Sequence, residues 1–343
     1  MSKKNYRVFS ILCLLLVVSL LISPLLGQIK LSEINWLDTW QALNEGTFST
    51  TELAIILKLR LPRIMAAAMT GSGLALAGLV MQACIQNPLA DPYILGVSSG
   101  ATAGATFAIV ILPTLITSHL SVMIAFSAFL GGILTTCLIL RLSHWFKNQL
   151  IILILIGVVI NSVCQALTSL FIYKAPNSEY VKSATYWTMG SLVGIGNQGL
   201  GLMAGTLLIL TIYFFKQSHV LDLLLLGNEQ AESLGIESQI YQRKLMLASA
   251  VLTSVLVSQT GVIGFIGLIV PHLARKLVGN KHQLVIITSL LLGSILLIWA
   301  DCLARIVVKN SELPIGVVTS LIGAPLFFMI ILDKYKNQGG VSC

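Results

Sequence analysis

The sequence predicts an all-α polytopic membrane protein, and three observations carry this prediction. The chain has 343 residues, of which 56% are hydrophobic and only 10% are charged, and its mean hydropathy is +0.91. The apolar residues form long continuous blocks, such as 8–26, 150–173 and 284–300. Blocks of about 18 or more apolar residues are typical of membrane-spanning helices. Because lipid offers no hydrogen-bonding partners, such blocks must satisfy their backbone internally, as helices do.

We expect about ten spans, because the apolar blocks divide into segments of roughly 20 residues. The expected spans are 8–27, 62–84, 93–112, 121–142, 149–171, 198–215, 242–262, 263–276, 283–305 and 313–332. They form one transmembrane domain over residues 1–343, since no linker or low-complexity segment separates them. The basic N-terminus with its apolar continuation could also be a signal peptide. It lacks a small-x-small cleavage motif, so we expect an uncleaved first helix.

The distribution of charge predicts the orientation of the chain and argues against nucleic-acid binding. With the N-terminus inside, Lys and Arg are more frequent in the inner loops than in the outer ones, so both termini are expected in the cytoplasm. The formal net charge of +8 is scattered between apolar blocks, unlike a nucleic-acid surface. The six cysteines form no CxxC motif and the five histidines are isolated, so neither disulfides nor a metal site is expected.

An arginine-rich motif, LRLPR at 59–63, opens the second expected span. Pro62 suits the first helical turn, where its missing N–H costs nothing. Arg60 and Arg63 are three residues apart and share one face of that turn. They lie on the outer side, against the positive-inside trend, and Arg305 reaches the same side at the end of the ninth span. These arginines either extend to the lipid interface or form a cluster that receives carboxylates from a docking protein; we favour the second interpretation.

A second stretch, 82–101, is rich in small and helix-breaking residues. Such residues allow close helix packing or a broken helix beside a cavity, and both interpretations remain open. Its candidate pathway residues are Ser98, Ser99 and Gly100. Asp91 lies between two prolines at a helix junction, where a capping role is expected. A similar Gly- and Pro-containing segment at 264–272 suggests an inverted repeat.

The longest inner loop contains a coupling candidate at 221–238 that combines leucines with a short helical pattern. Asn228 is expected to cap a helix that contains Glu229 and Glu232 and ends at Gly235. The leucines are too few to span a membrane and too apolar to remain in water. The segment therefore either lies in the membrane interface or docks a cytoplasmic partner, and we favour docking.

The sequence lacks the residues that an energy-converting or catalytic membrane protein needs. No Gly-x-x-x-x-Gly-Lys-[Ser/Thr] phosphate loop is present, so ATP hydrolysis is not expected from this chain. Ion-coupled transporters usually keep a carboxylate at mid-membrane; the nearest candidates are Asp91 and Asp301, and Asp301 is expected to pair with Arg305 four residues later. This pattern disfavours two alternatives, a secondary transporter and an intramembrane enzyme or sensor.

Taken in order, these motifs resemble the permease family of vitamin B12 and iron–siderophore ABC importers. The matching segments lie within 55–332 and read LRLPR, NPLADPYILGVSSGA, YWTMGSL, LLLLGNEQAESLGI, IGFIGLIVPHLAR, ADCLAR and ELPIGVVTSLIGAP. The resemblance implies ten helices per subunit, a dimer of identical or homologous permeases, two cytoplasmic ATPase subunits, and an extracytoplasmic binding protein or lipoprotein that delivers the ligand. It places the chain in the bacterial plasma membrane as an importer of iron–siderophore-type chelates, with ATP and Mg²⁺ bound by the ATPase rather than by this chain.

The resemblance also assigns roles to individual residues. Docking of the binding protein falls to Arg60, Arg63 and Arg305. The ATPase-coupling residues are Leu223, Leu226, Gly227, Asn228, Glu229, Ala231, Leu234 and Gly235. The fifth and tenth helices are expected to line the pathway, with a gate near Asn148, Gln149 and Leu150, where the sequence departs from the family's short hydroxyl-bearing pattern. Haem and cobalamin remain alternative ligands.

Overall fold

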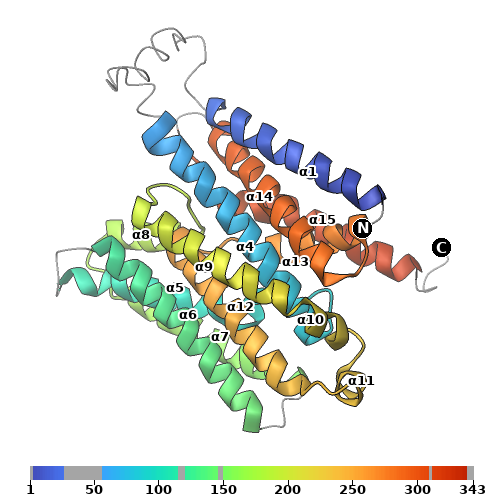
Figure 1. Cartoon of the computed structure of the whole chain (residues 1–343). Coiled ribbons are helices and arrows are strands. Elements are labelled where there is room, and N and C mark those ends of the chain that lie inside the picture. The colour runs from blue at the N-terminus through green and yellow to red at the C-terminus, as the bar shows by residue number, and fades with distance from the viewer. Residues whose placement is uncertain (1–2, 27–55, 115–119, 146–149, 309–310, 338–343) are drawn as a thin grey trace.

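The computed structural model describes residues 3–26, 56–114, 120–145, 150–308 and 311–337, and within these ranges the chain is helical without a strand (Figure 1). The α-helices are α1 Lys3–Ile22, α4 Leu61–Ile85, α5 Val97–Val110, α6 Leu120–Trp145, α7 Leu150–Tyr173, α8 Ser178–Thr188, α9 Asn197–Lys216, α10 Ser218–Leu224, α11 Asn228–Ser233, α12 Ser238–Thr260, α13 Ile266–Val278, α14 His282–Ile306 and α15 Ile315–Asn337. Shorter helical turns are η1 Ser23–Leu25, η3 Ile56–Arg60, η4 Pro92–Leu95 and η5 Leu112–Thr114.

Each of the ten predicted spans coincides with a helix, which confirms the all-α polytopic fold. Eight helices in the described residues are long and apolar enough to cross a membrane: α1, α4, α6, α7, α9, α12, α14 and α15. The other two, α5 and α13, have 14 and 13 residues and are too short to cross alone, because about 20 residues are needed. Each is preceded by a segment that is not α-helical, which we call a break. The break before α5 is 86–96, and the break before α13 is 261–265.

The two breaks meet inside the bundle. The hydroxyl of Tyr93 donates to the carbonyl of Ile263 at 2.8 Å and accepts from its N–H at 3.3 Å. Gln86, the first residue of the first break, has a left-handed φ of 54°, and Phe265, the last residue of the second break, has one of 69°. Asp91 accepts a hydrogen bond from the backbone N–H of Tyr93 at 2.8 Å, so its predicted capping role is confirmed. Broken helices are tolerated in membranes where protein buries them and satisfies their backbone groups, as the Tyr93 hydroxyl does here.

Helix α4 forms the centre of the bundle and packs against α14, α12, α13 and α9 (Figure 1). Nearly all of its residues are buried, and its small side chains permit the close packing. A Cβ on Gly71 would overlap the carbonyl oxygen of Gly293 on α14, and a Cβ on Gly78 would overlap that of Gly267 on α13. Backbones at this separation gain favourable dispersion contacts at these two crossing points.

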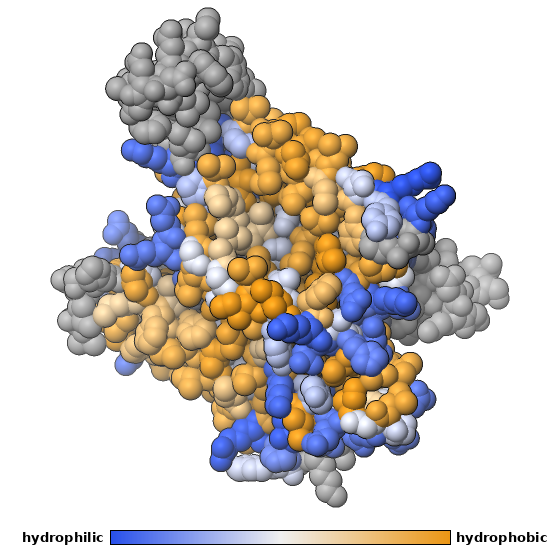
Figure 2. All heavy atoms as spheres, in the orientation of Figure 1, coloured by the Kyte–Doolittle hydropathy of each residue, from blue (hydrophilic) through white to orange (hydrophobic). Residues whose placement is uncertain are grey.

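The outside of the bundle is apolar, as a lipid-facing surface requires. Large exposed hydrophobic residues occur on α1, α6, α7, α9 and α15, and Figure 2 shows that hydrophobic residues cover much of the visible face. Such an area on a water-soluble protein would cause aggregation. Hydrophilic residues gather near the two ends of the bundle (Figure 2). We call the end where α4 begins and α14 ends the outer end, and the end with α10 and α11 the inner end.

The contact between α4 and α14 predicts that one added methyl group at Gly71 lowers the stability of the fold. Gly71→Ala forces the two helices apart, and we expect the free energy of unfolding to fall by roughly 1–3 kcal/mol. Gly205→Ala is the matched control, because a Cβ there meets nothing within 4 Å. It should be neutral or stabilising by up to about 1 kcal/mol. Thermal unfolding in detergent measures both, and equal midpoints for Gly71→Ala and the wild type would contradict the packing.

Candidate functional site

A charged cluster lies at the outer end of the bundle, where α4 begins and α14 ends. Arg63 Nε lies 2.7 Å from Asp301 Oδ1, and Arg305 Nε lies 3.1 Å from Asp301 Oδ2. Asp301 itself is fully buried. Arg60 donates to the carbonyl of Pro24, in the same turn whose carbonyls Arg305 contacts. The structure thus brings the three arginines of the sequence analysis together, and we call Arg60, Arg63, Arg305 and Asp301 the outer arginine cluster.

The burial of this cluster corrects one expectation. Arg305 was expected to face outward, but its side chain is 5% exposed and its Nη atoms donate to Ser23 and to the carbonyl of Leu26. Arg63 is 11% exposed. The cause is Asp301, because a buried carboxylate is stable only when paired. The predicted Asp301–Arg305 pair is confirmed, whereas the Arg63–Asp301 pair, between residues 238 positions apart, was not foreseen.

Arg63 carries a second carboxylate that the sequence analysis missed. Glu312, just before α15, places Oε2 2.6 Å from Arg63 Nη1 and is 47% exposed. The two side chains border a pocket of about 180 Å³ that Tyr186 and Ser191 also line. Glu312 begins the ELPIG motif, which is visible in the sequence. The motif does not show that Glu312 pairs with Arg63.

At the inner end, the predicted coupling segment folds as two short helices, α10 and α11, joined by a turn. Gly227 in the turn has φ 110° and Gly235 after α11 has φ 85°, backbone conformations that favour glycine. Leu226 and Leu234 are 52% and 59% exposed. Among the other coupling candidates, Glu229 is exposed and Leu223 is half-buried. Ala231 is fully buried inside this segment, and the coupling role of all these residues stays a prediction.

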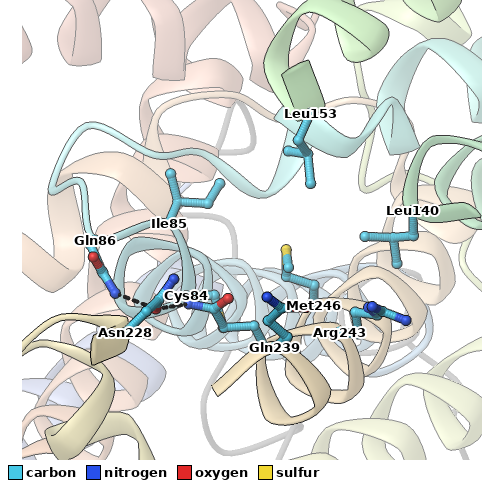
Figure 3. A pocket seen from close by; sticks show the side chains of 10 residues that line it. Cys84, Ile85, Gln86, Leu140, Leu153, Asn228, Gln239, Arg243 and Met246 are labelled. Atoms are coloured by element: carbon cyan, nitrogen blue, oxygen red, sulfur yellow. Dashed lines mark hydrogen bonds between the residues drawn. The ribbon is translucent and has the colours of Figure 1, made fainter. Parts of the chain in front are cut away.

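Asn228 does not cap α11, contrary to expectation. It is the first residue of α11, and the preceding Gly227 occupies the capping position without a side-chain bond. Its Oδ1 instead accepts hydrogen bonds from Gln86 Nε2 and from Gln242 Nε2, both at 2.8 Å. Figure 3 shows Gln86, at the end of α4, reaching Asn228 across the rim of a pocket of about 220 Å³. Arg243 also lines this pocket, and its guanidinium contacts His144 Nδ1 at 2.8 Å.

A second contact holds α10. Asp222 Oδ1 lies 2.6 Å from Nδ1 and 2.9 Å from the backbone N of His282, the first residue of α14. Because a carboxylate oxygen only accepts, Nδ1 carries the proton. Burial raises the pKa of Asp222, but the hydrogen bonds from His282 outweigh this effect and hold the pKa below its ordinary value.

The predicted gate and pathway residues are only partly described. Asn148 and Gln149 lie outside the described residues, and Leu150 begins α7. Ser99 donates to Asn161 Oδ1 on α7 at 2.5 Å, while Ser98 is half-buried. A Cβ on Gly100 would overlap Thr135 and Gly131 of α6, so helix packing accounts for the glycine. The place of these residues beside a pathway stays a prediction.

Helix α7 carries a polar face that the sequence analysis did not single out. Ser162, Gln165 and Ser169 are exposed and lie three and four residues apart, so they share one face of α7. The other amide and aliphatic hydroxyl side chains of α7, on Asn161 and Thr168, are at least partly buried. Exposed polar side chains are unfavourable against lipid, so this face indicates contact with water or with another polypeptide. The 3–4 spacing of hydroxyl and amide residues within 150–173 was the available signal.

Comparison with known proteins agrees with this architecture. The model of the FecCD transport family matches residues 15–333. The hemin transport system permease of Yersinia pestis is 36% identical over 333 residues, which are 96% of each chain. The iron(3+)-hydroxamate import system permease of Bacillus subtilis is 35% identical, covering 96% of this chain and 98% of the other. The vitamin B12 import system permease of Yersinia enterocolitica is 35% identical, covering 96% and 94%.

A solved structure described as an inward-facing conformation of a metal-chelate type ABC transporter superimposes with a TM-score of 0.81 at 32% identity, covering 96% of this chain and 99% of the other. The family match and these relatives extend over nearly the whole chain, including both ends of the bundle. The chain is therefore a multi-pass ABC importer permease that belongs to the FecCD transport family.

Proposed function

We propose that this permease receives an iron–siderophore-type chelate from an extracytoplasmic binding protein and moves it inward with energy from two cytoplasmic ATPase subunits. The observation that carries the proposal is that a charged cluster and an exposed apolar segment lie at opposite ends of the bundle, which we interpret as two recognition surfaces. One is the outer arginine cluster, and the other is the exposed leucine-bearing segment at α10 and α11. Because the sequence contains no phosphate loop, a partner must supply the energy.

The inner surface suits an ATPase. Leu226, in the turn between α10 and α11, and Leu234, directly after α11, are more than half exposed, and both helices are too short to cross the membrane. Because each side chain is about half exposed, covering it removes roughly 1 kcal/mol of unfavourable apolar exposure. Glu229, in the first turn of α11, adds a charged rim residue that favours one orientation of the partner.

The outer surface suits a partner that presents carboxylates. Arg60 is half-buried and donates a hydrogen bond to the backbone carbonyl of Pro24, and it lies close enough to Arg305 for the two positive charges to repel each other. Arg63 is paired with the exposed Glu312. A carboxylate from a partner would bind Arg63 by taking the place of Glu312. Guanidinium groups bind carboxylates with two parallel hydrogen bonds, which gives the contact both strength and direction.

The polar face of α7 supports a dimer of permeases around a central pathway. In a single chain Ser162, Gln165 and Ser169 would face lipid. A second permease, identical or homologous, packed along α7 and α15 would place this face beside a water-filled passage. Hydroxyl and amide groups without fixed charge suit a bulky chelate that must leave again, since tight binding would slow its release.

The names of the relatives keep the ligand open between three chemistries. Permeases for hemin, hydroxamate chelates and vitamin B12 all match at similar identity. We favour an iron–siderophore-type chelate; haem is the second candidate, because the hemin permease matches at 36% identity over nearly the whole chain.

Reconstitution tests the proposed function and its ligand together. We expect proteoliposomes with the permease, its ATPase and its binding protein to accumulate radiolabelled ferric hydroxamate when ATP is inside. Radiolabelled haem and cobalamin serve as competing ligands, and the preferred one identifies the class. Because the energy comes from the ATPase, omitting that subunit should abolish uptake. Uptake by the permease alone, driven by an ion gradient, would show a secondary transporter instead.

Charge reversal at Arg60 tests docking without breaking the buried pair. Arg63→Glu would place a second carboxylate beside Asp301 and endanger the fold. Arg60→Glu avoids this, and we expect it to lower the affinity for the binding protein by at least about tenfold. Surface plasmon resonance on the permease–ATPase complex in nanodiscs measures the affinity. Lys174→Glu, exposed just after the outer end of α7, is the control. Unchanged affinity in Arg60→Glu would argue against docking there.

A polar substitution at Leu234 tests the ATPase contact. Leu234→Asp removes an exposed apolar side chain and adds charge to the proposed contact, so less active ATPase should co-purify with the permease. Glu229→Arg should act in the same direction by reversing the charge of the rim. Lys216→Asp, exposed at the inner end of α9, is the control and should retain the wild-type amount. Full recovery of active ATPase with Leu234→Asp would count against this surface.

A further inference from the structure

The coupling segment is attached to the inner end of α14. Asp222 on α10 accepts two hydrogen bonds from His282, one from the backbone N–H and one from the ring. The backbone contact supplies α14 with an N-terminal carboxylate from another element, and a negative charge at that position is favoured by the helix dipole. His282 is fully buried, whereas the Asp222 side chain is partly exposed, so the contact lies at the edge of the bundle. Movement of α10 therefore acts directly on the first turn of α14.

The same segment is attached to the inner end of α4. Asn228 Oδ1, on α11, accepts from Gln86 and Gln242 at once (Figure 3). Gln86 is the residue that ends α4, and its left-handed backbone directs the side chain toward α11. Gln242 lies in the first turns of α12. The coupling segment thus holds the inner ends of α4 and α14 through separate contacts on its two short helices.

Helices α4 and α14 behave as one unit between the two ends. Gly71 and Gly293 bring their backbones into direct contact, and Ser294 Oγ donates to the carbonyl of Ala68 at 3.0 Å. Each helix has 25 residues, which corresponds to a length of about 37 Å. Packed helices with no room between their backbones shift together rather than deform.

The outer ends of the same two helices carry the outer arginine cluster. Arg63 stands in the first turn of α4, and Asp301 and Arg305 stand in the last turns of α14. The Arg63–Asp301 pair joins the outer ends of α4 and α14. The coupling segment joins their inner ends in the same way. A continuous series of contacts therefore runs from the coupling segment through α4 and α14 to the outer surface.

We propose that Asp222 and Gln86 are positioning residues that transmit movement between the coupling segment and the outer arginine cluster through the paired helices α4 and α14. The proposal rests on the proposed function, because it assumes an ATPase inside and a binding protein outside. Thermodynamic linkage is reciprocal, so docking outside shifts the coupling segment as much as the coupling segment shifts the docking surface.

The experiment uses the complete transporter in nanodiscs and compares ATP hydrolysis with and without the ligand-loaded binding protein. Asp222→Ala removes the contact to α14. Gln86→Asn keeps an amide and a residue type that tolerates the left-handed backbone, but its side chain is too short to reach Asn228. We expect either variant to reduce the stimulation of hydrolysis by about tenfold. Docking affinity should change by less than about twofold, because the outer arginine cluster is remote from both sites.

The controls separate positioning from general damage. Lys216→Ala changes an exposed side chain at the same end and should keep full stimulation. Asp222→Leu removes both hydrogen bonds to His282 while filling a similar space, and it replaces Asp222→Ala if thermal unfolding shows that variant to be unstable. Full stimulation in both Gln86→Asn and the Asp222 variant overturns the proposal. A wild-type complex that the binding protein does not stimulate refutes the proposed function itself, and the inference falls with it.

Discussion

The backbone contact between α4 and α14 is the constraint on which the rest of the arrangement depends. Two glycines, Gly71 and Gly293, permit a separation that a single methyl group would prevent. With the helices fixed at this distance, Arg63 at one end meets Asp301, and Gln86 at the other end reaches the segment that also binds His282. In lipid, where burial of apolar surface gives helices little reason to associate, such close packing is what holds them together.

Asp301 shows how one buried charge organises its surroundings. A carboxylate with no access to water needs compensation, and here two guanidiniums provide it from two different helices. This explains why Arg305 turns inward and why Arg63 is only slightly exposed. From the sequence, Arg63 and Arg305 were assigned to an outside partner, but both are paired with carboxylates of this chain and stabilise its fold. These pairs limit how far the two arginines are available to a partner.

Local patterns in the sequence determined much of the fold, while the partners of polar residues depended on tertiary structure. Apolar blocks located ten helices, and proline spacing located the cap at Asp91. The spans that contain α5 and α13 were expected to begin at 93 and 263, but the helices begin at Val97 and Ile266, because apolar residues continue into the ends of the breaks. Asn228 was misassigned as a cap because its partner Gln86 lies 142 residues away. A contact between residues so far apart produces no local pattern in a single sequence, so it could not be predicted.

The ion pair between Glu312 and Arg63 has a consequence for the energetics of association at the outer end. If an incoming carboxylate takes the place of Glu312, one ion pair is broken for each one formed, and the count of paired charges stays constant. The net Coulomb gain is then small, and screening by salt affects both states alike. At Arg63, shape and the release of bound water would therefore matter more than charge attraction, and the attraction for a partner's carboxylates would come mainly from Arg60.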